Sequence, residues 1–453
     1  MGKPEESSSN VLMNPMAIAT VIIGVSVLLL MYTLKLFRQE AVVENKEKNK
    51  KSSTQSEKKK ESLQGGKSKK KSADNRWVGK SEKQVYTNSW FLSSLKGHTG
   101  AILDMDFSSN GKYLTSCGDD RAVFIWETKD LTQRERKSLR INIEFDFATL
   151  IKWSPDSKAF IINKFNENTI EVYKVEKKKD GWLQASKALS FPKIHETDII
   201  GMGIASNGRY IMSCSNKTDM VIWDLKGQVL TKIDTYLMNT TCAKLSPCGK
   251  FVVASGFSPE AKVWEVIFNK SGEFQEVKQI KQLTLGGHTS GVYDIAFDVD
   301  SSHMATVSKD GTWNLYDTKV NYKLGEDARI IRSGKYDQCS GNARIALSPD
   351  AEVIVITTSN KMSFYSASTA KLDNTIENVF LGDITSLMFD STGKYILVSG
   401  DKQIKIFHNV TGYRCTIETA KEKLKEHQTS ATKERLQKLI TECQDFIKNI
   451  DRK

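Results

Sequence analysis

The sequence predicts an all-β fold, a seven-bladed β-propeller, preceded by a transmembrane helix and followed by a helical tail. Three observations support this prediction. A strand–turn pattern recurs seven times at a spacing of roughly 40–50 residues. A long uncharged apolar run lies near the N-terminus, and the final segment is amphipathic and lacks Gly and Pro. Hydrophobic residues make up 39% of the 453-residue chain, which excludes a wholly disordered protein.

Residues 11–34 are predicted to form a transmembrane helix, after a short lumenal N-terminus at 1–10. The last 19 residues of this run, ending at Leu34, form an uninterrupted apolar stretch. A helix of that length spans the ~30 Å hydrocarbon core of a bilayer. A buried core helix and a cleaved signal peptide are the alternatives. Because positive charge follows the run, at Lys35 and Arg38, we expect an uncleaved anchor with the rest of the chain in the cytosol.

Residues 35–83 are predicted to be a basic, disordered linker. Between 44 and 83, thirteen lysines and Arg76 stand against six acidic residues, a net charge of +8 out of +12 for the chain. The linker has too few apolar residues to bury a core. Three interpretations remain open: a solvated tether, contact with anionic lipid headgroups, and contact with RNA or ribosome phosphates. The basic tract comprises Lys46, Lys48, Lys50, Lys51, Lys58, Lys59, Lys60, Lys67, Lys69, Lys70 and Lys71.

The propeller is predicted over residues 84–416. Its clearest repeats are 95–126, 195–224 and 287–317, and in each a histidine precedes an aromatic residue by 28 positions. Each repeat contains four short strands, which bury both faces only when the repeats close into a ring. Residues 89–95 precede the first repeat and are predicted to form the outer strand of the last blade. The four weaker repeats end near Tyr173, Trp264, Tyr365 and Phe407.

The three clear repeats carry a candidate set of buried polar residues. In such a set the aromatic residue donates to a hydroxyl, the hydroxyl to a histidine, and the histidine to an aspartate, so that each polar group has a partner. Lys217 stands where the second set should have its aspartate, and a tyrosine replaces tryptophan in the third. Because the sets recur around the ring at one spacing, we interpret them as structural rather than as catalytic triads. The sets are His98, Ser116, Asp120 and Trp126; His195, Ser213 and Trp223; and His288, Thr306, Asp310 and Tyr316.

Residues 417–453 are predicted to be helical, as one helix or two, because apolar residues recur at helical spacing from Leu436 to Ile450. We expect this tail to pack on the side or the bottom of a monomeric propeller, with a self-associating coil as the alternative. The sequence contains no Cys-x-x-Cys pair and no phosphate-binding glycine loop. We therefore expect no enzyme activity, no cofactor and no metal.

The strand–turn pattern resembles that of the WD40-repeat family. Longer strings outside that pattern are similar to the transducin beta-like branch of the family: DLTQRERKSLR at 130–140, KSGEFQEV at 270–277, VSKDGTWNLYDT at 307–318 and FHNVTGYR at 407–414. This resemblance implies an endoplasmic-reticulum membrane protein that acts in the unfolded-protein response. It also implies a scaffold whose partners are an ER stress kinase, the large ribosomal subunit and mRNA. The alternative function is an RNA- or ribosome-binding module driven by the lysine-rich linker.

Overall fold

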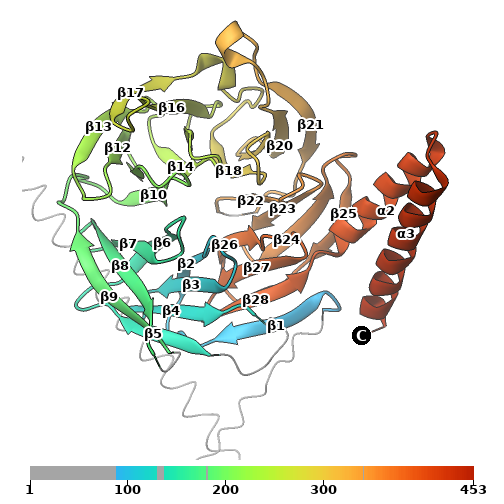
Figure 1. The fold of residues 1–453 in the computed structure, drawn as a ribbon, viewed down its shortest axis with the longest axis horizontal. Coiled ribbons are helices and arrows are strands. Elements are labelled where there is room, and N and C mark those ends of the chain that lie inside the picture. The colour runs from blue at the N-terminus through green and yellow to red at the C-terminus, as the bar shows by residue number, and fades with distance from the viewer. Residues whose placement is uncertain (1–87, 130–136, 180–181, 340, 453) are drawn as a thin grey trace, which may run out of the picture. The chain divides into compact units, whose positions relative to one another are not determined.

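The computed structural model describes residues 88–129, 137–179, 182–339 and 341–452. The predicted lumenal segment, the transmembrane helix and the basic tract lie outside these residues. Within the described ranges, no helix has both the length and the apolar character needed to cross a membrane. The described strands form seven four-stranded antiparallel sheets, which are arranged as blades around a central axis (Figure 1).

The blades follow one another in chain order, and each of the first six is continuous in sequence. Blade 1 contains β2 (Ile102–Phe107), β3 (Tyr113–Gly118), β4 (Ala122–Glu127) and β5 (Ser138–Asn142); blade 2 contains β6 (Ala148–Trp153), β7 (Ala159–Lys164), β8 (Thr169–Lys177) and β9 (Leu183–Ser190); blade 3 contains β10 (Ile199–Ile204), β11 (Ile211–Ser215), β12 (Asp219–Trp223) and β13 (Val229–Asp234). Blade 4 contains β14 (Thr240–Leu245), β15 (Phe251–Gly256), β16 (Lys262–Phe268) and β17 (Phe274–Gln279); blade 5 contains β18 (Val292–Phe297), β19 (His303–Ser308), β20 (Thr312–Asp317) and β21 (Arg329–Lys335); blade 6 contains β22 (Arg344–Leu347), β23 (Val353–Thr358), β24 (Lys361–Ser366) and β25 (Leu372–Ile376). Blade 7 contains β26 (Ile384–Phe389), β27 (Tyr395–Gly400), β28 (Gln403–His408) and β1 (Phe91–Lys96), and short 3-10 helices lie at η1 (Lys281–Leu283) and η2 (Tyr322–Leu324).

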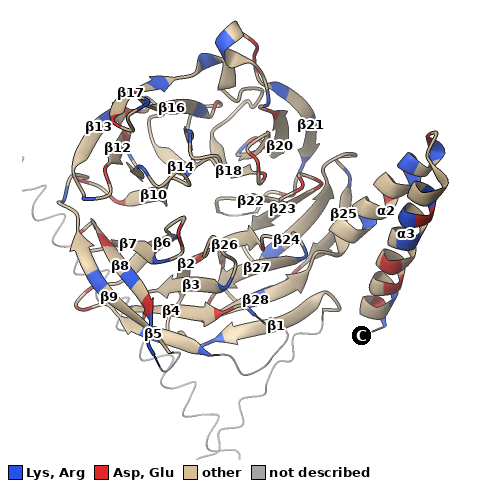
Figure 2. Ribbon diagram, viewed as in Figure 1, with Lys and Arg blue, Asp and Glu red and all other residues tan. Residues whose placement is uncertain are grey.

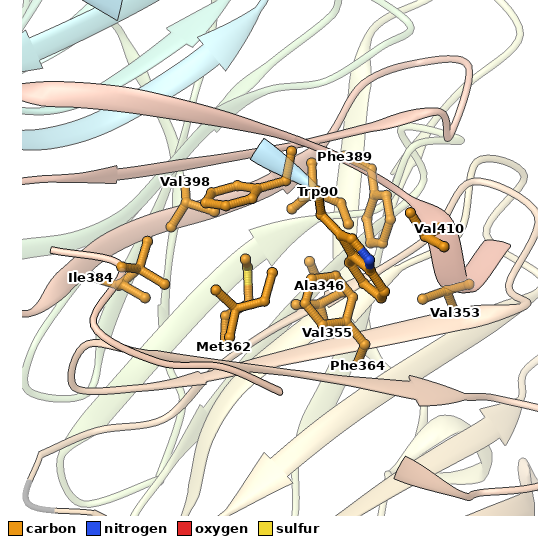
Figure 3. Packing of buried hydrophobic residues seen from close by; sticks show 14 of the residues in the cluster. Trp90, Ala346, Val353, Val355, Met362, Phe364, Ile384, Phe389, Val398 and Val410 are labelled. Carbon is orange, nitrogen blue, oxygen red and sulfur yellow. The ribbon is translucent and has the colours of Figure 1, made fainter. Parts of the chain in front are cut away.

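Burial of a strand depends on its position in the blade. All six residues of β23, the second strand of blade 6, are buried, because neighbouring blades cover both of its faces. The outer strand β5 instead alternates between exposed and partly buried residues. Apolar side chains of adjacent blades meet between the sheets. Figure 3 shows one such cluster, in which Val355 and Phe364 of blade 6 lie with Val398 of blade 7.

The ring is closed by a strand from the start of the described chain. Strand β1 pairs antiparallel with β28, and Phe91 lies opposite Phe407. This confirms the prediction that residues 89–95 complete the last blade. Trp90, just before β1, is only 3% exposed and meets Phe364 of blade 6 edge-on, with 4.9 Å between ring centroids (Figure 3). The N-terminal segment therefore contributes both a strand and a core side chain to the closure.

The tail is helical, but it begins earlier than residue 417 and contains two helices, α2 (Val410–Lys425) and α3 (Ser430–Asp451). The early start has a local cause, because the side chain of Asn409 accepts a hydrogen bond from Gly412 N at 3.0 Å and so caps the helix. Thr429 caps α3 in the same way. The tail packs at the side of the ring beside blade 6, where Arg414 donates to both oxygens of Asp373 (Figure 1).

Replacing Trp90 by alanine should destabilise the protein by ~3–5 kcal/mol, because it removes a large side chain from the junction of blades 6 and 7. Thermal and denaturant unfolding would measure the loss. Phe257→Ala is the matched control, since that aromatic ring is 53% exposed and should cost little. Equal stability of the two variants would contradict the assigned closure.

Candidate functional site

In blade 1, the four predicted residues form one continuous chain of hydrogen bonds. Nε1 of Trp126 donates to Ser116 Oγ at 3.0 Å, and that oxygen lies 2.9 Å from His98 Nε2. On the other side of the imidazole, His98 Nδ1 lies 2.9 Å from Asp120 Oδ1. Since Asp120 also accepts from Thr99 N at 2.8 Å, the chain fixes the loop before β2 against β3 and β4.

The glycine before the first histidine is required by a close approach. A Cβ atom at Gly97 would lie 2.7 Å from Cη2 of Trp126 and 3.0 Å from the ring of Phe124. No side chain fits between these two aromatic rings and the backbone. In the Gly-His pair, close packing therefore requires the glycine, and the hydrogen bonds require the histidine.

In blade 3, the structure supplies the aspartate that the sequence seemed to lack. His195 Nε2 lies 2.7 Å from Ser213 Oγ, which accepts from Trp223 Nε1 at 2.8 Å. His195 Nδ1 bonds to Asp219, the first residue of β12, and Lys217 takes no part in this chain. The carboxylate that pairs with the histidine is therefore Asp219, two positions after Lys217 in the sequence, and the set is complete.

In blade 5, the tyrosine that replaces tryptophan changes how the series of hydrogen bonds ends. His288 Nε2 lies 2.7 Å from Thr306 Oγ1, but the hydroxyl of Tyr316 donates to the backbone oxygen of Gly286 at 2.8 Å. His288 Nδ1 lies 3.3 Å from Asp310 and 3.1 Å from Thr312 Oγ1. Thr312 and Asp219 each lie 24 residues after the histidine of their set. This shared spacing could have identified the second acceptor position from the sequence.

Blade 2, one of the weaker repeats, carries a different polar set. The hydroxyl of Tyr173, which stands at the aromatic position, donates to Glu171 at 3.0 Å. Lys187 lies 2.5 Å and Lys164 lies 3.6 Å from the same carboxylate. Glu171 is only 3% exposed, so these two ammonium groups compensate a charge that burial would otherwise penalise.

The three histidines are neutral at neutral pH. Burial lowers the pKa of His98, His195 and His288 below the ordinary 6.5, against the opposing influence of their carboxylates. The bonding pattern fits an Nδ1–H that donates to the carboxylate and an Nε2 that accepts from the hydroxyl. The hydroxyls of these sets have no access to solvent, since Ser116, Ser213 and Thr306 are each 0% exposed. No substrate can reach them, which supports a structural role.

The central channel contains charged residues that sequence analysis did not single out. Asp104 of β2 lies 2.7 Å from Lys152 Nζ and accepts from Ile151 N of blade 2 at 3.1 Å. Asp294 of β18 lies 2.7 Å from Lys244 Nζ of blade 4 and accepts from Ile345 N of blade 6 at 3.0 Å. Each aspartate therefore bonds to the inner strand of the blade that follows its own.

The two aspartates occupy equivalent positions, because each follows its Gly-His histidine by six residues. That shared offset is the signal by which they could have been found. Burial raises the pKa of the neighbouring Asp106 to about 6, although Lys152 opposes the shift. Together with Arg344, these side chains line a channel of about 490 Å³, in which acidic and basic groups balance.

Among the residues that the structure describes, no group of three or more His, Cys, Asp or Glu side chains is placed to hold a metal ion. The basic tract from Lys46 to Lys71 lies outside the described residues. The buried polar sets described above thus bond strands to one another and one blade to the next.

Two substitutions at one residue separate packing from hydrogen bonding in the first set. Trp126→Ala should cost ~3–5 kcal/mol, because it removes a ring stacked on Phe124 with 5.1 Å between centroids. Trp126→Phe keeps most of the volume but leaves Ser116 without its donor, and should cost about 1–2 kcal/mol. Denaturant unfolding checks both values. A Phe variant as unstable as the Ala variant would mean that the hydrogen bond, not packing, dominates.

Stability should fall as pH drops below about 6.5, because the unfolded chain takes up protons that the three buried histidines of the folded state do not. The raised pKa of Asp106 acts in the opposite direction, since the folded state gains protons there as pH falls through about 6. Asp106→Asn should therefore lose stability more steeply on acidification than the wild type. Melting temperatures between about pH 7.5 and 5.5 measure both slopes. An acid-insensitive wild type would count against neutral, buried histidines.

Comparison with known proteins agrees with this architecture. The family model described as WD domain, G-beta repeat matches residues 89–127, 279–317 and 374–408. These ranges cover the closing strand β1, most of blades 1, 5 and 7, and the ends of β17 and β25. Transducin beta-like protein 2 of Homo sapiens is 42% identical over 82% of this chain and 83% of its own length, and that of Mus musculus is 43% identical over 84% and 87%. A more distant relative, actin-related protein 2/3 complex subunit 1A-B of Xenopus laevis, is 25% identical over 54% of this chain and 57% of its own length. With its closed ring of blades and this extent of similarity, the chain belongs to the transducin beta-like protein 2 family of WD40-repeat proteins.

Proposed function

We propose that this protein is a non-enzymatic scaffold, tethered to the endoplasmic-reticulum membrane with its propeller in the cytosol. The observation that carries the proposal is the use of the buried polar groups. The histidines and hydroxyls of these sets are buried and engaged in blade structure, so the exposed faces and the rim remain for partners. A rigid ring can hold several partners at once, and confinement to a membrane raises their effective concentration.

The proposed position at the membrane rests on the N-terminal sequence. The uncharged run at 11–34 has the length of a membrane span, and the charge that follows it favours a cytosolic C-terminal side. The linker at 35–83 then separates the propeller from the bilayer. The proposed partners, an ER stress kinase, the large ribosomal subunit and mRNA, rest on the family resemblance.

A second function, binding of RNA or ribosomes through the linker, is favoured by one specific feature. Of the chain's net charge of +12, a charge of +8 lies between residues 44 and 83. Such a tract gives electrostatic, sequence-independent affinity for phosphate. Its lysine run from Lys46 to Lys71 lacks the interleaved aromatic residues that stack on bases, so sequence-selective recognition is not expected from it.

Topology can be tested by protease protection of intact microsomes that contain the full chain with a C-terminal epitope. Added protease should remove the epitope, while a lumenal marker survives until detergent is added. A protected epitope would contradict the cytosolic assignment. A glycan at Asn239 would do so as well, because its side chain is exposed and its Asn-x-Thr triplet could accept one in the lumen. Asn409 gives no information, since it is 3% exposed and caps α2.

A salt titration separates the two functions. Binding of RNA through the tract should weaken steeply with ionic strength, and replacing its lysines by serine should abolish it. Association with the kinase should survive both changes if the propeller is the scaffold. Loss of kinase and RNA together in the serine variant would instead make the linker the binding element and contradict the scaffold proposal.

A further inference from the structure

A groove lies at the edge of the ring between blades 1 and 2. Its volume is about 760 Å³, and its walls come from β4 and β5 of blade 1 and from the end of the β8–β9 hairpin of blade 2. Strand β8 contains nine residues, whereas β4 contains six. The hairpin therefore extends beyond the first blade's strands and provides one wall. We call this feature the rim groove.

The rim groove combines an apolar floor with a basic border. Ile125 and Leu139 of blade 1 and Leu183 of blade 2 line its interior. Trp182, at the hairpin, is 60% exposed, which is unusual for the largest apolar side chain. The border carries four exposed lysines and one carboxylate, that of Glu127; the lysines are Lys112, Lys129, Lys137 and Lys177. Figure 2 marks the basic residues of these two blades.

The lysines of the border are available for a ligand. Some lysines of the other blade surfaces do form ion pairs, as Lys187 does with Glu171 and Lys361 with Asp337. Among the described residues, none of the four border lysines forms an ion pair; Lys137 instead places its ammonium group 5.5 Å from the centroid of the Trp182 ring. The described residues of the groove therefore present more positive than negative charge, directly beside exposed apolar surface.

We propose that the rim groove binds an acidic peptide segment that carries a large apolar side chain. The apolar side chain would enter between Trp182 and the floor, and flanking Asp or Glu residues would pair with the border lysines. Charge complementarity selects this occupant over a neutral or basic peptide. The inference rests on the proposed scaffold function, for which it supplies a docking site and the chemistry of the partner.

The geometry favours a peptide over single-stranded nucleic acid. Nucleic-acid sites expose a series of aromatic faces on which successive bases stack. Here the exposed ring is that of Trp182, and Lys137 lies over it. The second aromatic residue of the lining, Tyr113, is partly buried and stacks on Trp153, while Ile125, Leu139 and Leu183 provide aliphatic surface. A concave aliphatic floor suits a single large side chain.

The experiment measures fluorescence anisotropy of labelled peptides with the full-length protein in mild detergent. The probe is a short peptide of Asp and Glu around a central Phe-Leu pair. Matched probes replace Phe-Leu by Ala-Ala or the acidic residues by Lys, and a labelled oligouridylate represents RNA. The first probe should bind, the other two peptides should bind at least about tenfold more weakly, and its affinity should fall with salt.

Variants of the groove assign the binding to it. Trp182→Ala should weaken the first probe by about tenfold or more, as expected for a central anchor. Lys137→Glu combined with Lys177→Glu should do the same, whereas Lys278→Glu, an exposed lysine on β17 of blade 4, should leave binding unchanged. Melting temperatures equal to that of the wild type would exclude unfolding as the cause of a loss.

Three outcomes would overturn the inference. These are failure of the acidic Phe-Leu peptide to bind, equal binding by the Trp182→Ala variant, and Trp182-dependent binding of oligouridylate without the peptide. None of these outcomes would contradict the scaffold proposal, because that proposal is tested by the topology and kinase-association experiments. Conversely, a lumenal propeller would overturn the scaffold proposal while peptide binding in detergent persisted.

Discussion

The antiparallel pairing of β1 with β28 is the constraint on which the rest of the structure depends. It joins Phe91 to Phe407, residues from opposite ends of the propeller sequence, and completes the seventh blade. Without β1, that blade would present an open edge, and Trp90 would leave the core that blades 6 and 7 share. The six other blades are continuous in sequence, but each buries its faces only against neighbours in a closed ring.

Closure also gives the buried polar groups a common purpose. Within blades, the chains through His98, His195 and His288 hold strands against the loops that precede them. Between blades, Asp104 and Asp294 accept backbone N–H groups of the following inner strand. The apolar clusters provide most of the hydrophobic driving force, while these hydrogen bonds fix how each blade is oriented relative to the next.

Features set by local periodicity could be predicted from the sequence. The seven repeats, their terminal aromatic residues and the closing strand follow from strand–turn spacing, and the set in blade 1 follows from the fixed offset between His98 and Trp126. The acceptor for His195 could not be placed with confidence from spacing, because a loop displaced by two residues delivers Asp219 to the same point in space. The helix start at Val410 was missed since its cap, Asn409, reads as part of a strand end. The rim groove depends on the length of the β8–β9 hairpin relative to another blade, which periodicity does not encode.

The closing strand has a mechanical consequence. Strand β1 begins at Phe91, only a few residues after the N-terminal segment 1–87. Tension applied along that segment would therefore act first on the β1–β28 pairing. A pull directed along the axis of β1 would strain the cross-strand hydrogen bonds of this antiparallel pair together in shear, rather than open them one at a time. At the same end of β28, the chain continues into α2, whose contact with Asp373 connects the loaded blade to its neighbour. The joint that completes the ring is thus also the point at which a tethered propeller would resist being pulled open.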